Sequence, residues 1–173
     1  MMVQIFYPKE CVRSAYEIPY EAFYKKGIRG IIFDIDNTLV MHGAPADERA
    51  MQLFARLRAA GFHTCLLSNN KEARVTPFAK AVGSDCVWKA GKPGQNGYRE
   101  AMRRMGTSVS STLFVGDQLF TDVYGANRSG IYSILVNPID PREEIQIVIK
   151  RRLERIVLWF YRRSQKRVAE EKK

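Results

Sequence analysis

Short apolar runs alternate with amphipathic segments along most of the chain. The apolar runs are rich in β-branched residues and have the length of buried strands, and the predicted strands cover 27–36, 62–68, 85–90, 111–117 and 132–137. Apolar residues at helical spacing fill the segments between them, and the predicted helices cover 46–61, 71–83, 97–106 and 122–130. Pro77 should kink the second of these helices or delay its start. The alternation predicts a three-layer α/β/α, Rossmann-like domain around a central parallel sheet of about five strands.

Two further regions flank this alternation. The aromatic-rich segment 16–26 is interpreted as a piece that packs onto the domain. A last helix is predicted from about residue 142 towards residue 167, where apolar residues again recur every three or four positions. We therefore expect one domain over 1–141, including the N-terminal packing segment, and a basic amphipathic C-terminal helix and tail over 142–173.

Polar residues follow the predicted strands at the points where they end. Asp34 and Asp36 end the first strand, Ser68 and the two asparagines after it end the second, and Asp117 ends the fourth. In open parallel sheets, ligands bind beyond the carboxyl ends of the strands, so these side chains should face a common site. Asp34 and Asp36 are two residues apart on a strand and therefore point the same way.

The predicted site gathers more acidic groups than can all stay ionised without a counter-ion. Asp122, in the turn after the fourth strand, should join Asp34, Asp36 and Asp117, and a hard cation such as Mg²⁺ would balance the four carboxylates. The Ser68 hydroxyl, the backbone N–H groups of the turns "SNN" and "DNT", and a lysine ammonium lie near the same edge. These groups suit phosphoryl chemistry, in which one carboxylate attacks phosphorus and another donates and accepts protons.

The motifs "DIDNT", "SNN", "KP" and "GDQLFTD" resemble, in order and spacing, the four motifs of the haloacid dehalogenase (HAD) superfamily. The resemblance implies that Asp34 is the nucleophile and Asp36 the general acid and base. Lys92 would stabilise the phosphate charge; it is preferred over the nearby Lys89 because it precedes a proline. The resemblance further implies two sets of ligands: Ser68, Asn69, Asn37 and Thr38 for phosphate, and Asp34, Asp36, Asp117 and Asp122 for Mg²⁺.

The spacing between these motifs leaves no room for a cap domain. The superfamily inserts its specificity caps between Asp34 and Ser68 or between Ser68 and Lys92, and a predicted helix and strand already fill each interval. The whole pattern is similar to the capless YqeG-type phosphatases of subfamily IIIA, which are related to phosphatidylglycerophosphate phosphatases. That resemblance implies hydrolysis of phosphatidylglycerophosphate to phosphatidylglycerol in phospholipid biosynthesis.

Charge and composition favour an anionic partner. The chain has a formal net charge of +10, and basic residues outnumber acidic ones in the predicted C-terminal helix and tail. A basic helix that also contains Trp159 and Tyr161 suits an anionic membrane surface, and a nucleic acid is a less favoured partner. The alternative, that the apolar residues of this helix cap the sheet and its charges are solvated, stays open. No apolar run reaches the roughly 18 to 20 residues that span a bilayer, and no secretory signal is recognised. We therefore expect a cytoplasmic protein, peripheral on the inner face of a membrane, with its three cysteines reduced.

Two alternatives stay open. The same chemistry could act on a soluble sugar phosphate or nucleotide, or the chain could be an RNA- or ribosome-binding module with secondary catalysis. The intact acidic set argues against the second, because a vestigial site would be free to lose Asp34 or Asp36. Three further residues are ambiguous. Arg74 and Lys71 are either solvated helix charges or ligands of a second phosphate, and His42 is interpreted as a surface residue rather than part of a flap over the site.

Overall fold

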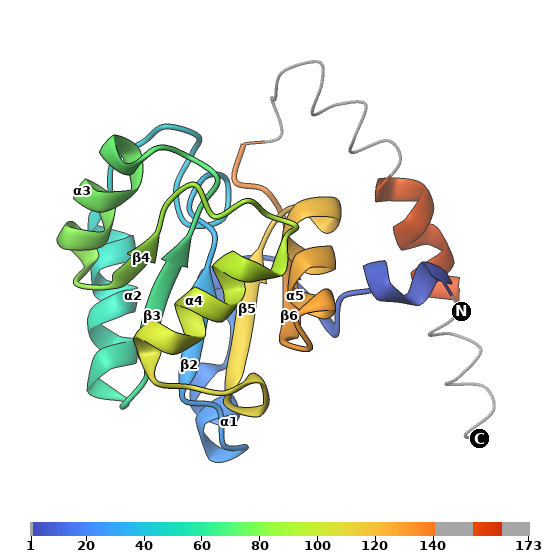
Figure 1. Ribbon diagram of the computed structural model, residues 1–173, viewed down its shortest axis with the longest axis horizontal. Coiled ribbons are helices and arrows are strands. Elements are labelled where there is room, and N and C mark those ends of the chain that lie inside the picture. The colour runs from blue at the N-terminus through green and yellow to red at the C-terminus, as the bar shows by residue number, and fades with distance from the viewer. Residues whose placement is uncertain (1, 141–153, 164–173) are drawn as a thin grey trace.

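A computed structural model describes residues 2–140 and 154–163, and Figure 1 shows a central sheet with helices on both faces. The sheet has six strands in the order β1-β6-β5-β2-β3-β4, and every neighbouring pair is parallel. The strands are β1 (Glu10–Val12), β2 (Gly30–Phe33), β3 (His63–Leu67), β4 (Asp85–Val87), β5 (Thr112–Gly116) and β6 (Tyr132–Val136).

The five predicted strands correspond to β2 through β6, and the sixth strand was missed. β1 adds to the edge of the sheet beside β6, with Glu10 opposite Ile134 and Val12 opposite Val136. Three residues are too few to show a two-residue alternation, so no sequence pattern distinguishes β1 from a loop. The expected class, a three-layer α/β/α domain with a parallel sheet, is confirmed.

Each face of the sheet carries its own helices and its own apolar core. α1 (Tyr20–Lys25), α2 (Glu48–Ala59) and α3 (Glu72–Val82) cover one face, while α4 (Gln95–Met105) and α5 (Tyr124–Arg128) cover the other. Neighbouring strand residues point to opposite faces and join opposite cores. The buried side chains of α1 include Tyr20 and Phe23, which belong to the core on this face of the sheet.

Pro77 lies inside α3 and does not delay its start. The helix begins at Glu72, five residues before the proline. A proline in a helix leaves the carbonyl four residues earlier without its usual amide donor. That residue is Ala73, and both Ala73 and Pro77 are exposed, so water can satisfy the free carbonyl. The expectation of a delayed start was wrong for this reason.

The strand order indicates where the candidate site lies. The chain runs outwards from β2 to β3 and β4, then returns to β5 on the other side of β2. This reversal between β2 and β5 is the position where parallel α/β sheets bind ligands. Within residues 2–140, no additional folded unit interrupts the connections where a cap was considered, in agreement with the expected absence of a cap domain.

The predicted C-terminal helix is described only in part. The chain is helical at 154–163, whereas 141–153 and 164–173 lie outside the described residues. This helix at 154–163, called the C-terminal helix below, lies beside η1 (Met2–Phe6) in Figure 1. The rings of Tyr7 and Tyr161 are 5.1 Å apart, centre to centre. Among the described residues, no helix combines the length and the apolar character needed to cross a bilayer.

Candidate active site

Three buried aspartates meet at the carboxyl edge of the sheet. Asp34 directly follows β2, Asp117 directly follows β5, and Asp122 lies in η4 (Leu119–Val123), a turn of π-helix between β5 and α5. One carboxylate oxygen from each residue lies within 4.8 Å of the others. The three residues are between 0% and 7% exposed. The structure therefore brings together three of the four carboxylates that the sequence placed at this edge.

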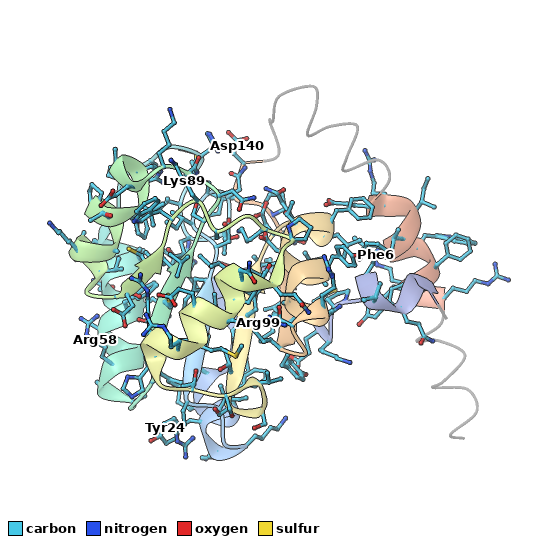
Figure 2. All side chains as sticks on the ribbon, in the orientation of Figure 1. Phe6, Tyr24, Arg58, Lys89, Arg99 and Asp140 are labelled. Atoms are coloured by element: carbon cyan, nitrogen blue, oxygen red, sulfur yellow. The ribbon has the colours of Figure 1, made fainter. Side chains whose placement is uncertain are left out.

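Lys92 inserts its ammonium group among these carboxylates. Its Nζ lies 2.5 Å from Asp34 Oδ1 and 2.7 Å from Asp122 Oδ1, and the side chain is buried. Lys89 is exposed at the molecular surface (Figure 2), with its Nζ over the ring of Trp88. Of the two lysines considered from the sequence, the structure thus places Lys92 in the cluster.

The electrostatics of the cluster leave an excess of negative charge. Burial raises the pKa of Asp34 above its usual range, although the ammonium of Lys92 opposes this rise. Burial by itself would lower the pKa of Lys92, but the carboxylates of Asp122 and Asp34 outweigh that effect and raise it, so Lys92 stays charged. One ammonium inside the cluster faces three carboxylates. A divalent cation at this position would balance the charge.

The turn after β2 contains Asn37 and Thr38, two of the predicted phosphate ligands. Asn37 adopts a left-handed backbone conformation (φ 63°), which asparagine tolerates better than most residues. Its side-chain oxygen accepts a hydrogen bond from the Asp140 amide at 3.4 Å. The Thr38 hydroxyl donates to Asp117 Oδ1 at 3.1 Å. Of these two predicted phosphate ligands, Asn37 lines the pocket described below, while the Thr38 hydroxyl is bonded to the aspartate cluster.

The turn after β3 positions the backbone of Lys92. Ser68 is buried, and its hydroxyl accepts a hydrogen bond from the Asn70 amide at 3.2 Å. The side chain of Asn69 donates to the Lys92 carbonyl at 3.1 Å and accepts from the Lys92 amide at 2.7 Å. Ser68 and Asn69 both line the pocket, and Asn69 also fixes the loop from which Lys92 reaches the cluster.

Asp36 departs from the predicted set of metal ligands. Its carboxylate lies outside the group formed by the three aspartates and is bonded elsewhere. Oδ1 accepts hydrogen bonds from Arg74 Nη2 at 2.9 Å and from the Gly43 amide at 2.8 Å, and Oδ2 accepts from Asn70 Nδ2 at 2.7 Å. These three donors, from α3, the segment before α2 and the turn after β3, bond the carboxylate outside the cluster, although Asp36 still lines the pocket.

Gly116, the first residue of the motif "GDQLFTD", and Tyr98, which belongs to none of the motifs, shape the position of Asp122. A Cβ atom on Gly116 would lie 2.6 Å from Asp122 Oδ2, so only glycine leaves room for that carboxylate. The hydroxyl of Tyr98, on α4, donates to the Asp122 carbonyl at 3.0 Å. Its position in the helix is that of an ordinary core residue, and no sequence pattern indicates this contact.

These groups surround a pocket of about 200 Å³. His42, interpreted from the sequence as a surface residue, is exposed but also lines this pocket. Gln118 and Thr121, from the loop between Asp117 and Asp122, line it as well and were not anticipated. The complete lining is Asp34, Asp36, Asn37, His42, Ser68, Asn69, Asn70, Lys92, Gln118 and Thr121.

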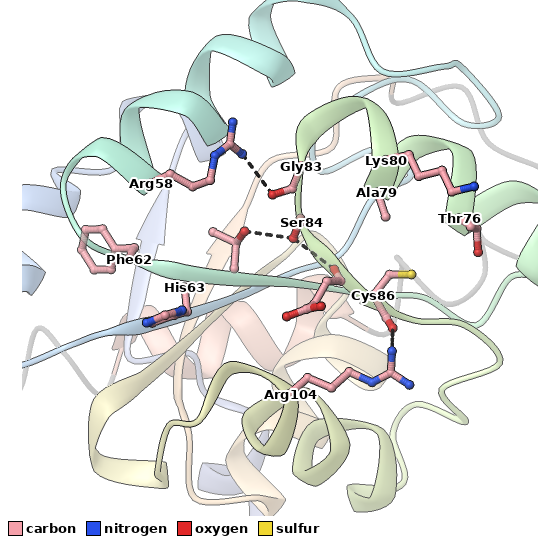
Figure 3. Close-up of a pocket in the computed structure, with 12 residues that line it drawn as sticks. Arg58, Phe62, His63, Thr76, Ala79, Lys80, Gly83, Ser84, Cys86 and Arg104 are labelled. Carbon is pink, nitrogen blue, oxygen red and sulfur yellow. Dashed lines mark hydrogen bonds between the residues drawn. The ribbon is translucent and has the colours of Figure 1, made fainter.

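A larger hollow of about 480 Å³ lies elsewhere, where β3 and β4 begin (Figure 3). Its two arginines already bond to backbone carbonyls. Arg58 donates to the carbonyls of Val82 and Gly83, at the end of α3, and Arg104 donates to the carbonyl of Cys86. Cations stabilise the carboxyl ends of helices, so Arg58 has a structural explanation there. Both arginines of this hollow thus have structural partners.

The aspartate cluster fits a divalent cation. Its ligands are carboxylate oxygens, which hard cations prefer, and they come from two neighbouring strand ends and the turn η4. The three side chains are buried together and carry more negative charge than Lys92 offsets. Asp34, Asp117 and Asp122 are therefore the residues that would hold such an ion.

A parallel α/β sheet with acidic groups and a buried lysine at its switch point is suited to phosphoryl transfer. A sequence model of haloacid dehalogenase-like hydrolases matches residues 43–130. A protein named "Probable phosphatase YqeG" from Bacillus subtilis is 34% identical over 95% of this chain and 96% of its own length. The chain belongs to the haloacid dehalogenase-like hydrolases. The expected superfamily and the expected class of enzyme, a phosphomonoester hydrolase, are both confirmed.

More distant relatives match part of their own length or share the fold alone. Phosphatidylglycerophosphate phosphatase 1 of Arabidopsis thaliana is 27% identical over 90% of this chain, and that of Chlamydomonas reinhardtii is 29% identical over 79%. The chain spans about half the length of these two proteins, 48% and 55% respectively. The solved cobalt-bound deoxy-D-mannose-octulosonate 8-phosphate phosphatase of Haemophilus influenzae has a TM-score of 0.50 at 14% identity, covering 65% of this chain and 80% of that one. This likeness shows the fold.

Proposed function

We propose that this protein is a Mg²⁺-dependent phosphatase that hydrolyses phosphatidylglycerophosphate to phosphatidylglycerol through an aspartyl-phosphate on Asp34. The observation that carries the chemistry is the contact between Asp34 and Lys92, a buried carboxylate and a buried ammonium that both line the pocket. A nucleophile next to a fixed positive charge can attack phosphorus while the charge on the phosphoryl oxygens is neutralised.

Different groups around the pocket are proposed to bind the cation and the phosphate. Mg²⁺, bound by Asp34, Asp117 and Asp122, would supply further neutralisation of the phosphoryl oxygens. Ser68 and the backbone amides of the turns after β2 and β3 are proposed to bind the phosphate group. Asn37 and Thr38 would shape the first turn, and Asn69 would shape the second by holding the backbone of Lys92.

The proposed reaction has two steps. An oxygen of Asp34 attacks phosphorus, the bond to the leaving oxygen breaks, and Asp36 gives that oxygen a proton. Water then attacks the phosphorus of the aspartyl-phosphate and passes a proton to the Asp36 carboxylate, which regenerates Asp34 and releases inorganic phosphate. Asp36 lines the same pocket as Asp34, which supports this role.

The substrate is proposed from the sequence relatives. Two of them are named phosphatidylglycerophosphate phosphatases, and the YqeG protein, which matches along almost its whole length, is named a phosphatase. The uncovered site supports a substrate that is part of a larger surface. A lipid head group can reach a pocket that no cap domain encloses.

A membrane-facing surface is proposed on the C-terminal helix. Its outward side chains include Ile156, Trp159 and Phe160, which are 56%, 54% and 51% exposed. Arg155, Arg162 and Arg163 are exposed beside them, so apolar and cationic groups occupy the same side. Aromatic and basic side chains together suit the interface of an anionic bilayer. We propose that the helix is part of a basic C-terminal segment, 142–173, which brings the catalytic domain, 1–141, to phosphatidylglycerol-rich membranes.

A soluble sugar phosphate or nucleotide is the second candidate substrate. The pocket of about 200 Å³ suits a phosphoryl group and its immediate neighbours, and it requires no lipid chain. The superfamily chemistry would be the same for either substrate. The two candidates therefore differ in the group that leaves and in the role of the C-terminal helix.

Phosphate release from a panel of phosphomonoesters tests this proposal. The panel contains phosphatidylglycerophosphate in mixed micelles, glycerol 3-phosphate, a hexose phosphate and a nucleoside monophosphate, each with Mg²⁺ and with a chelator. We expect Mg²⁺-dependent release with the highest kcat/KM for the lipid, and none from the Asp34→Asn variant. Preference for a soluble ester would support the second candidate, and activity unaffected by chelation would contradict the metal role.

A further inference from the structure

The C-terminal helix contacts the loop that contains two of the cluster aspartates. Glu154, the first described residue of this helix, accepts a hydrogen bond from the backbone amide of Leu119 at 2.9 Å. Leu119 lies between Asp117 and Asp122 in sequence and starts η4. The acceptor comes from 35 residues further along the chain. A distant part of the sequence thus holds the loop of the candidate cation site.

This hydrogen bond satisfies an amide that has no partner inside its own helix. The first N–H groups of a helix lack intrahelical acceptors, and Leu119 is fully buried, so water cannot replace a missing one. The next amide towards the cluster, that of Gln118, donates to Asp122 Oδ2 at 3.0 Å. Two consecutive amides at the start of η4 are therefore held by carboxylates, one from the cluster and one from Glu154.

Apolar packing holds Glu154 in place. Leu119 and Val123, both in η4, form a small buried cluster with Leu135, and Val157 and Leu158 of the C-terminal helix pack against it. Phe6 packs on the same cluster and lies between α5 and the C-terminal helix in Figure 2. Glu154 itself is only 6% exposed. The inner face of the helix thus covers the outer side of the η4 turn.

We infer that Glu154 is a positioning residue for the candidate cation site. By fixing the amide of Leu119, it fixes where η4 begins and hence the separation of Asp117 from Asp122. Glu154 is not among the residues that line the pocket. The inference rests on the proposed function, because it assigns Glu154 a role towards the cation that the three aspartates are proposed to hold.

Binding of Mg²⁺ without substrate tests this role in the full chain. The readouts are the Mg²⁺ concentration that gives half-maximal thermal stabilisation and the hydrogen exchange of the Leu119 amide. Three variants are compared with the wild type: Glu154→Ala removes the acceptor, Glu154→Gln keeps an acceptor oxygen without the charge, and Arg155→Ala changes an exposed neighbour on the same helix.

We expect Glu154→Ala to need about tenfold more Mg²⁺ for half-maximal thermal stabilisation, the size of effect typical of groups that orient metal ligands. The Leu119 amide hydrogen should also exchange faster in this variant. Glu154→Gln should stay within about threefold of the wild type, since it can still accept the bond, and Arg155→Ala should match it. If Glu154→Ala does not fold, Glu154→Asp, which shortens the side chain by one methylene, should raise the Mg²⁺ requirement about threefold.

The possible failures are distinguishable. If Glu154→Ala or Glu154→Asp requires the same Mg²⁺ concentration as the wild type, the role of Glu154 is overturned and the proposed cation site is not. The same holds if Glu154→Gln is as impaired as Glu154→Ala. A wild-type protein that Mg²⁺ does not stabilise at all would contradict the proposed cation site itself, and the inference would fall with it.

Discussion

The guanidinium group of Arg74 holds the carboxylate of Asp36 away from the aspartate cluster, with Nη2 2.9 Å from Oδ1. Arg74 lies in the first turn of α3, and its guanidinium lies over the ring of Phe78, which keeps it on the same side of the site. The side chains of Arg74 and Asp36 are 20% and 12% exposed, so little water screens the pair. The sequence left Arg74 as a solvated helix charge or a ligand of a second phosphate. This contact supports a role that neither interpretation named, in which Arg74 orients Asp36.

Replacing Arg74 should therefore impair turnover more than binding. In Arg74→Ala the Asp36 carboxylate loses its charged partner and its orientation, and we expect kcat to fall about tenfold or more with KM nearly unchanged. Lys80→Ala, which removes an exposed charge in the last turn of the same helix, is the matched control and should behave as the wild type. Steady-state kinetics separates the two constants. A raised KM at normal kcat would indicate instead that Arg74 binds a second phosphate of the substrate.

The proton-transfer role of Asp36 predicts a dependence on the leaving group. Asp36→Asn cannot protonate the departing oxygen, and alkyl phosphates, whose leaving groups are poor, need that proton most. We expect roughly a 100-fold loss of kcat/KM for an alkyl phosphate and less than tenfold for a nitrophenyl phosphate. Equal losses for the two ester classes would contradict the acid role and point to a structural effect of the substitution.

Lys92 should stabilise the fold as well as the reaction. Lys92→Met leaves Asp34 and Asp122 buried without their cation, and breaking a buried ion pair in this way costs about 3–5 kcal/mol. We expect the free energy of unfolding, measured by urea denaturation in a chelator, to fall by that amount. Lys89→Met, at an exposed position three residues earlier, should change it by about 0.5 kcal/mol or less. Similar midpoints for the two variants would show that the buried contact contributes little.

The proposed membrane surface can be followed by the fluorescence of Trp159. The chain has two tryptophans, so Trp88→Phe leaves Trp159 as the single reporter. We expect its emission to shift to shorter wavelength with phosphatidylglycerol vesicles and not with phosphatidylcholine vesicles, and the shift to weaken with salt, because exposed arginines flank the ring. The same variant with Phe160→Ala should bind more weakly. An unchanged emission on anionic vesicles would contradict the surface, and a shift with RNA instead would favour a nucleic-acid partner.

The sequence predicted most of the fold because the fold depends on repeated local patterns. Strands buried on both faces give continuous apolar runs, which identified β2, β3, β5 and β6, while β4, a partly buried edge strand, gave a shorter apolar run. The ends of these strands located Asp34, Asp117 and Ser68. β1 was not predicted because its position depends on pairing with β6, a contact between distant parts of the chain. The effect predicted for Pro77 was wrong because the energetic cost of a proline inside a helix depends on whether the freed carbonyl is exposed to water, and the sequence alone does not give that exposure.

The candidate site was predictable only as far as its motifs extend. The motifs indicated which acidic residues lie at the same edge of the sheet. The direction of the Asp36 carboxylate, however, depends on hydrogen bonds from Asn70, in the turn after β3, and Arg74, in α3. Tyr98 and Glu154 act on Asp122 and Leu119 through backbone atoms, and such contacts leave no pattern of residue types. The predicted separation of a domain over 1–141 from a tail over 142–173 stays a prediction.

The most direct test of the account is the identity of the phosphorylated residue. Acid quenching during turnover of a labelled aryl phosphate, followed by mass spectrometry of the peptide that contains residues 33–40, would locate the phosphoryl group. Asp36→Asn is the informative background, because slow activation of water should let the intermediate accumulate. We predict phosphorylation of Asp34, and neither label nor phosphate release in Asp34→Asn. Label on another residue, or turnover by Asp34→Asn, would contradict the proposed mechanism.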